Sequence, residues 1–216
     1  MNEPETTANY SWVEEFDTLS SAINKGWVII NNSRPLGSGS WTQGSYALSN
    51  GKVSGFPAAS YTYSGNDYVT CGYYCGSNVA TLSAWLFTPP SMMKNGDQLT
   101  FYSRTVLEPA DYPDRLQVRL NTQDISTDVG NGPLSDAGIA NGVGKYDKVL
   151  LEINPNLLQS GSDAYPGKWT KYIVTVTNTP ERALRRFAFR YFVTNGGTSG
   201  VNSDAIGIDS VAFISK

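Results

Sequence analysis

The sequence predicts an all-β fold, a jelly-roll β-sandwich made of two antiparallel sheets. About ten short apolar runs alternate with turns rich in Gly, Pro and Asn, which is typical of a sandwich. No segment has the long apolar period of about 3.6 residues that a helix requires. The clearest signal is Arg115–Leu120, where Leu116, Val118 and Leu120 alternate with polar residues, as in a half-buried antiparallel strand.

The other elements follow from local patterns. We expect a helical turn at Leu19–Asn24, ended by Gly26, and a strand that Pro89 ends because proline cannot donate to a ladder. Trp41–Ala47 fits either a strand or an ordered loop, and Asn121–Lys145 is a long polar loop. The expected strands are Tyr10–Asp17, Trp27–Ile30, Val79–Thr88, Leu99–Leu107, Arg115–Leu120, Lys148–Ile153, Trp169–Thr177, Arg186–Val193 and Ile206–Ile214.

The last stretch, Arg186–Ile214, organises the prediction. Its first strand places Phe187, Phe189, Tyr191 and Val193 on one face, since successive strand side chains alternate. A loop of Gly, Ser, Asn and Thr follows, and then a strand in which alternation puts Asp209 on the face of Val211 and Phe213. Burying a carboxylate among apolar residues is costly unless it is paired or bound to a metal, so Asp209 is the best lead to a site.

The length of 216 residues fits a single domain, which we place at residues 12–216. Residues 1–11 are polar and acidic, and we expect a flexible lead from which a natural export signal is missing. No apolar run of about 18 residues is present, so no membrane span is expected.

Composition excludes several classes of function. The chain has no histidine, which excludes Ser-His-Asp and Cys-His catalysis within it and removes the commonest ligand of transition metals. A net charge of −3 argues against nucleic acid, which needs a positive patch.

Taken together, the segments EEFD, GWVIIN, SAWLFTPP, NGDQLTFYSRT, DRLQVRL, WTKYIVTV, RFAFRYFV and IGIDSV resemble, in this order, the choice-of-anchor J domain. That family is related to the cleaved-adhesin modules of surface proteins from Bacteroidetes. The resemblance extends from about Glu14 to Ile214. It implies a jelly roll similar to galactose-binding and MAM-type domains, exported to the cell surface and generally non-catalytic.

The resemblance also implies a structural Ca²⁺ where the first and last strands meet, held by Glu15, Asp17 and Asp209. Carboxylate oxygens are ligands that Ca²⁺ prefers. The alternative is that Asp209 accepts hydrogen bonds from backbone amides, or pairs with Arg104 or Arg190. No D-x-[DN]-x-[DN]-G loop is present.

Cys71 and Cys75 stand in the sequence CGYYC, whose spacing differs from the C-x-x-C redox motif. A local disulfide is expected if the protein is exported, and two free thiols are the alternative. Two cysteines are too few for a structural zinc site without other ligands.

Aromatic side chains in polar loops predict a carbohydrate-binding platform, because sugars stack their CH faces on rings. The candidates are Trp41, Tyr61, Tyr63, Tyr73 and Tyr74. The alternative for each ring is packing at a sheet edge with its polar atom satisfied locally.

An enzyme would need paired carboxylates, as in glycoside hydrolysis. The nearby acidic pairs in a mid-chain loop are Asp111 with Asp114 and Glu108 with Asp111, and ordinary solvated loop charge is the better explanation of both.

The sequence therefore predicts a non-catalytic binding or adhesion module, extracellular or on the cell surface, with an outer-membrane lipoprotein as one form of it. Its partner is a glycan or a surface protein, and it is expected to be a monomer. Protein–protein adhesion or a spacer role is the second hypothesis, and a hidden activity accessory to a glycoside hydrolase or peptidase is the third.

Overall fold

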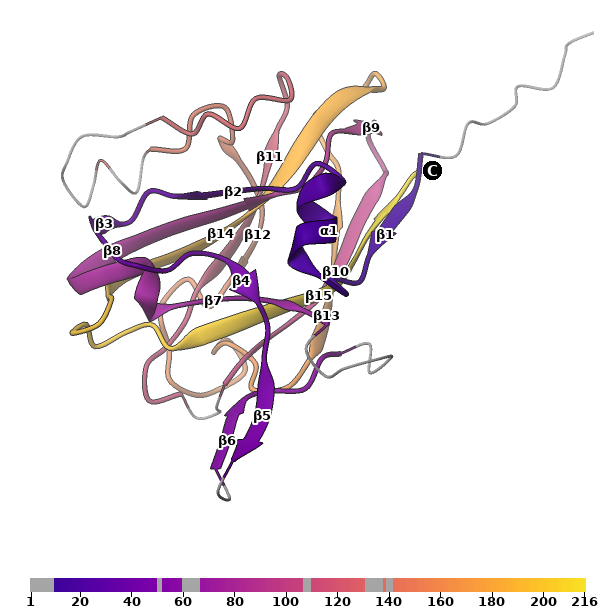
Figure 1. Cartoon of the computed structure of the whole chain (residues 1–216). Helices are drawn as coiled ribbons and strands as arrows, with labels where there is room; N and C mark the ends of the chain where they lie inside the picture. The colour runs from indigo at the N-terminus through magenta and orange to yellow at the C-terminus, as the bar shows by residue number, and fades with distance from the viewer. Residues whose placement is uncertain (1–9, 50–51, 60–66, 107–109, 131–137, 139–141) are drawn as a thin grey trace, which may run out of the picture.

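Two antiparallel sheets stack face to face in the computed structural model, which describes residues 10–49, 52–59, 67–106, 110–130, 138 and 142–216 (Figure 1). The elements are β1 Trp12–Glu14, α1 Leu19–Asn24, β2 Val28–Asn31, β3 Arg34–Leu36, β4 Thr42–Gln43, β5 Tyr46–Ser49, β6 Lys52–Gly55, β7 Val69–Gly72, the 3-10 turn η1 Tyr73–Cys75, β8 Gly76–Phe87, β9 Ser91–Met93, β10 Gln98–Thr105, β11 Leu116–Asn121, β12 Lys148–Ile153, β13 Thr170–Thr175, β14 Ala183–Gly196 and β15 Ala205–Ile214. The predicted jelly-roll sandwich is confirmed.

The first sheet has the strand order β13-β10-β15-β7-β4, with β1 also on β15. The second has the order β12-β11-β14-β8-β2, with β3 on β8 and β9 on β14. The hairpin β5–β6 projects from the sandwich (Figure 1). Successive strands repeatedly change sheet, from β7 to β8, from β10 to β11 and from β14 to β15.

The core between the sheets is the predicted aromatic wall. Phe187, Phe189 and Tyr191 of β14 are fully buried together with the inward residues of β10 and β15. The rings of Phe101 and Phe189 join the two sheets edge to face, with centroids 5.0 Å apart. Such pairs stabilise a core beyond the apolar area that they bury.

Local signals set the ends of elements as expected. The Thr18 hydroxyl caps α1 by accepting a hydrogen bond from the Ser21 amide. Strand β8 ends at Phe87, two residues before Pro89. None of the described helices is long and apolar enough to cross a bilayer.

Strand β11 differs from the prediction, because both of its faces are buried. The outer face, expected to be solvated, lies under the segment that precedes β12. The Arg119 guanidinium donates to the Tyr146 carbonyl at 2.7 Å, and Tyr146 packs on Trp85 and Phe87 of β8. Alternation showed which residues face the core, but the cover over the other face comes from a remote part of the chain.

Asp209 does not share a face with Val211 and Phe213, so that prediction is wrong. A bulge at Ser210, with a left-handed φ of 48°, places two residues of β15 opposite one of β10. One extra residue reverses the alternation after it. Val211 and Phe213 therefore face the core, whereas Asp209 lies on the outer face with Gly207, against which Phe56 and Trp169 pack.

Candidate functional site

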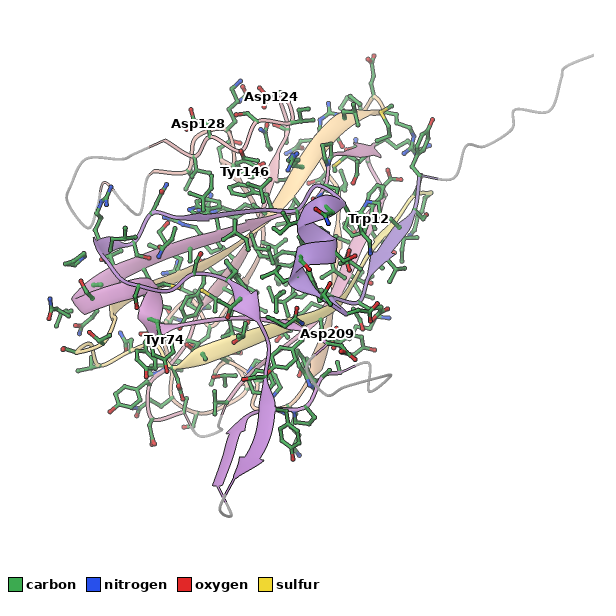
Figure 2. The ribbon with its side chains drawn as sticks, in the orientation of Figure 1. Trp12, Tyr74, Asp124, Asp128, Tyr146 and Asp209 are labelled. Atoms are coloured by element: carbon green, nitrogen blue, oxygen red, sulfur yellow. The ribbon has the colours of Figure 1, made fainter. Side chains whose placement is uncertain are left out.

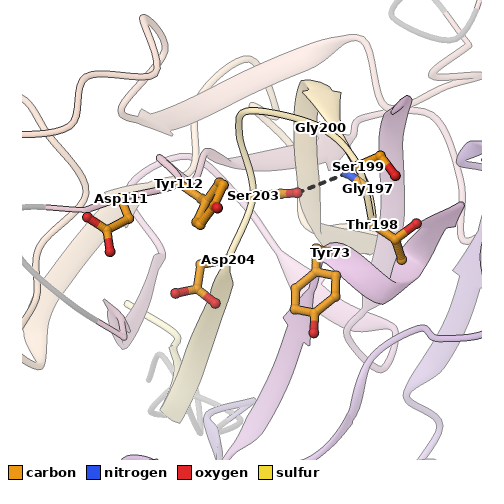
Figure 3. A pocket seen from close by; sticks show the side chains of 9 residues that line it. All are labelled: Tyr73, Asp111, Tyr112, Gly197, Thr198, Ser199, Gly200, Ser203 and Asp204. Carbon is orange, nitrogen blue, oxygen red and sulfur yellow. Dashed lines mark hydrogen bonds between the residues drawn. The ribbon is translucent and has the colours of Figure 1, made fainter. Parts of the chain in front are cut away.

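A pocket opens at one end of the sandwich, where three sheet-to-sheet connections meet (Figure 3). They are η1 between β7 and β8, residues 111–112 before β11, and residues 197–204 between β14 and β15. The last of these is the Gly, Ser, Asn and Thr loop of the C-terminal stretch. The pocket has a volume of about 540 Å³ and is lined by Tyr73, Asp111, Tyr112, Gly197, Thr198, Ser199, Gly200, Ser203 and Asp204.

Hydrogen bonds fix the loop that forms one wall of the pocket. The Gly197 amide, at a positive φ of 87° that suits glycine, donates to the Ser203 hydroxyl at 3.0 Å. The Ser203 amide donates to the Pro113 carbonyl at 3.0 Å, which ties this loop to the next one. The Thr198 hydroxyl accepts from the Asn78 amide. The wall is thus largely formed before any ligand arrives.

Two tyrosines give the pocket its aromatic surface. The Tyr73 amide donates to the Asp204 carbonyl at 2.9 Å, which holds η1 against the start of β15. The Tyr73 ring lies 3.9 Å from that of Tyr74, centroid to centroid. The hydrogen bond with Tyr74, together with burial, raises the pKa of Tyr73 to about 12, so its hydroxyl keeps its proton. Tyr112 is 49% exposed.

Asp114 lies beneath the pocket and is fully buried. Its Oδ1 accepts from the Asp204 amide at 3.0 Å and from the Tyr191 hydroxyl, and its Oδ2 is within hydrogen-bond distance of the Thr105 hydroxyl. Burial raises the pKa of Asp114 to about 6, although these hydrogen bonds act in the opposite direction. The Thr105 hydroxyl has a single proton and also lies 3.1 Å from the Ala205 carbonyl. A protonated Asp114 that donates to Thr105 would satisfy both contacts.

Asp111 and Asp204 provide the charge of the pocket. Among the described residues, neither carboxylate takes part in a hydrogen bond or an ion pair, because Asp111 and Asp204 accept only through their backbone carbonyls. Burial, and then the negative charge of Asp111, raise the pKa of Asp204. Two acceptors without partners thus stand at the pocket wall beside Tyr73 and Tyr112 (Figure 3).

The structure places the residues of the predicted aromatic platform in different surroundings. The prediction of an exposed ring is wrong for Trp41, because this residue is 2% exposed and its Nε1 donates to the Ala84 carbonyl inside the core. Tyr61 and Tyr63 lie outside the described residues. Tyr73 lines the pocket, and Tyr74 is 54% exposed next to it at the same end of the sandwich (Figure 2).

Two of the three predicted calcium ligands accept hydrogen bonds from the protein, and the third is exposed. The backbone amides of Ala59 and Ser210 donate to the two carboxylate oxygens of Asp209, each at 2.7 Å. This is the alternative given above, in which Asp209 accepts hydrogen bonds from backbone amides. Glu15 accepts from the Ser210 hydroxyl at 2.6 Å, and Asp17 is exposed. In the part of the chain that the structure describes, no three His, Cys, Asp or Glu side chains converge as a metal site would need.

Cys71 and Cys75 are both buried, one on each side of the tyrosine pair, as thiols whose Sγ atoms lie 2.9 Å apart. Burial raises the pKa of the Cys71 thiol well above its usual range, so it stays protonated in the folded protein.

Of the acidic pairs weighed for an enzyme, Asp111 and Asp114 do not face one space. Asp111 lines the pocket while Asp114 is buried behind it, and Glu108 lies outside the described residues. Tyr112 and Asp204 were not predicted as site residues. The available signal was the polar loop before β15, whose glycines and hydroxyls are typical of binding loops.

Comparisons with known proteins give the fold. The chain matches no protein-family model and no curated protein. It is similar in structure to the K3 cleaved adhesin domain of Lys-gingipain from Porphyromonas gingivalis, with 18% identity, 97% of this chain and 99% of that domain covered, and a TM-score of 0.58. The K1 domain of the same protein gives 18% identity, 95% and 98% coverage, and a TM-score of 0.54. At such identities the likeness shows a shared β-sandwich.

We expect Asp209→Asn to lower the free energy of unfolding by about 1–3 kcal/mol, because an amide nitrogen would face a buried N–H donor. The exposed Asp17→Asn should change it by less than about 0.5 kcal/mol. Urea denaturation checks both values. Calcium binding stays a prediction, and calorimetry on chelator-treated protein tests it. A calcium-dependent rise in Tm that both substitutions abolish would restore the predicted site.

Asp114 makes stability depend on pH. Its pKa is raised in the folded protein, so the folded state binds the proton more tightly than the unfolded chain does. The contribution of Asp114 is therefore fully present below about pH 4 and is lost as pH rises to about 6. We expect Asp114→Asn, which resembles the protonated acid in shape, to gain up to roughly 3 kcal/mol relative to the unsubstituted protein between pH 4 and pH 8. Urea midpoints at the two pH values measure this gain, and an equal effect at both would contradict it.

Proposed function

We propose that the chain is a non-catalytic binding module that holds a carbohydrate in the pocket between η1, residues 111–112 and the loop 197–204. One observation carries the proposal: Tyr73 and Tyr112 line an open pocket whose other walls are hydroxyls, glycines and carboxylates. Rings supply faces for the CH groups of a sugar, and polar groups orient its hydroxyls. This combination is typical of ligand sites.

The rigidity of the pocket supports the same proposal. The Asp204 amide is held by Asp114, the Ser203 amide by Pro113 and the Gly197 amide by Ser203. A wall that is already ordered loses little conformational entropy on binding, which leaves more of the contact energy as affinity.

Protein–protein adhesion is the second candidate, and a spacer role the third. Three exposed apolar side chains near the pocket favour adhesion, namely Tyr74, Val79 and Val201, which are 54%, 54% and 62% exposed. The solved structures of similar fold are described as adhesin domains, which is a statement about those proteins. We also propose that the chain is a member of the choice-of-anchor J family, is exported and carries a lipoprotein anchor. The order of the sequence motifs supports this proposal.

Among the residues that the structure describes, the separation of Asp111 from Asp114 supports a module without catalysis. A glycosidase needs two carboxyl groups that face one substrate. Asp114, the partner expected for Asp111, is directed to Thr105, Tyr191 and the Asp204 amide inside the protein.

We expect Tyr73→Ala and Tyr112→Ala each to weaken binding of the best glycan on an array by roughly threefold to tenfold, since an aromatic contact contributes about 0.5–1.5 kcal/mol. Calorimetry with that glycan gives the affinities. Tyr46→Ala is the control, because Tyr46 is exposed on the β5–β6 hairpin and does not line the pocket. A folded protein that binds no glycan, or whose binding ignores both tyrosines, would contradict the proposal.

We further propose that Cys71 and Cys75 form a disulfide after export. The two thiols would lose two protons and two electrons to a disulfide oxidant such as oxidised glutathione, before burial protects them. In this proposal the bond closes a short loop around Tyr73 and Tyr74, and we expect Cys71→Ser with Cys75→Ser to lower the free energy of unfolding by about 2 kcal/mol. Intact mass and thiol titration of oxidised protein give the bond directly. Two titratable thiols after refolding with oxidised glutathione would disprove it.

A further inference from the structure

We infer that the pocket prefers a sugar that carries a free amine, such as a glucosamine residue, and that Asp111 and Asp204 recognise its ammonium group. This inference rests on the proposed function and names the chemical class of its ligand. Three features of the pocket support it, namely the charges in its lining, its free acceptor oxygens and its ring faces.

The charge of the lining has one sign. Among the described residues that line the pocket, Asp111 and Asp204 are charged and none is Lys or Arg. The four ion pairs among the described residues involve other acids, namely Glu14, Asp97, Asp124 and Glu152. Two carboxylates in one partly enclosed space repel each other, and a bound cation would remove that repulsion.

The hydrogen-bonding capacity of the pocket also fits an ammonium. The carboxylates of Asp111 and Asp204 accept no hydrogen bond from the described residues, so their oxygens can accept hydrogen bonds from a ligand. An ammonium brings three donors and no acceptor. Its charge-assisted hydrogen bonds are stronger than those of a sugar hydroxyl. A neutral N-acetyl group would bring a single donor and a carbonyl that faces negative oxygens.

The faces of the aromatic rings also favour a bound ammonium group. Aromatic rings attract cations placed over their faces, and Tyr73 and Tyr112 stand beside the two carboxylates (Figure 3). The hydroxyls of Thr198 and Ser199 lie in the wall formed by loop 197–204. In this arrangement the rings and carboxylates would contact the amine-bearing part of a sugar, and the hydroxyls of loop 197–204 would contact its neutral part.

The test compares two sugars with the same glycan backbone, whose nitrogen is a free amine in one and a neutral N-acetyl group in the other. Fully deacetylated glucosamine hexamer and its N-acetylated counterpart share one backbone, and calorimetry on the full chain measures both. We expect the amine form to bind about tenfold more tightly at low salt, and added salt to reduce this preference. Asp111→Asn and Asp204→Asn should each reduce the preference, and Asp163→Asn, an exposed acid outside the pocket, should leave it unchanged.

The outcomes separate this inference from the proposed function. Equal affinity for both hexamers, with binding still lost in Tyr73→Ala, would overturn the amine preference and leave the carbohydrate site intact. If neither hexamer bound and no neutral glycan bound either, the proposed function itself would fail. Displacement of the amine hexamer by calcium at low concentration, or tighter binding of a lysine-rich peptide, would also overturn the inference, because a metal or a protein would then be the better occupant.

Discussion

The carboxyl group of Asp114 is the interaction on which the pocket depends. It reaches Thr105 in the first sheet, Tyr191 in the second and the amide at the start of β15, so one side chain joins both layers at the end where three connections cross. A fully buried carboxyl is costly unless its hydrogen bonds are satisfied, and here it contacts three hydrogen-bonding groups. The core sets the distance between the sheets, and Asp114 fixes the loops that extend beyond them.

Much of the fold could be predicted because strand alternation is a local property. The aromatic wall of Phe187, Phe189 and Tyr191 lies in the core as the two-residue period indicated. The same period failed at Asp209, because a single extra residue at Ser210 reverses every later side chain, and no composition signal marks that residue. It failed again on β11, whose outer face is covered by Tyr146 from a segment remote in sequence.

The site was less predictable because it is assembled by topology. Tyr73 could be proposed from a loop rich in Tyr and Gly, but the same reasoning selected Trp41, whose ring fills the core. Nothing in the sequence brings Tyr112 and Asp204 together, since 91 residues separate them and only the sheet-to-sheet crossings place them at one pocket. Residue type can suggest what a side chain does, whereas its neighbours follow from strand order.

The hydrogen bonds that hold residue 204 at the pocket wall involve its backbone atoms alone. Asp114 holds position 204 through its main-chain nitrogen, and Tyr73 is held through the carbonyl of the same residue. Neither bond uses the side chain of residue 204, and only proline would remove the amide donor. The recognition group at 204 can therefore be exchanged without disturbing the scaffold that presents it, which makes this end of the sandwich a natural place for related chains to diversify and for loop grafting in the laboratory.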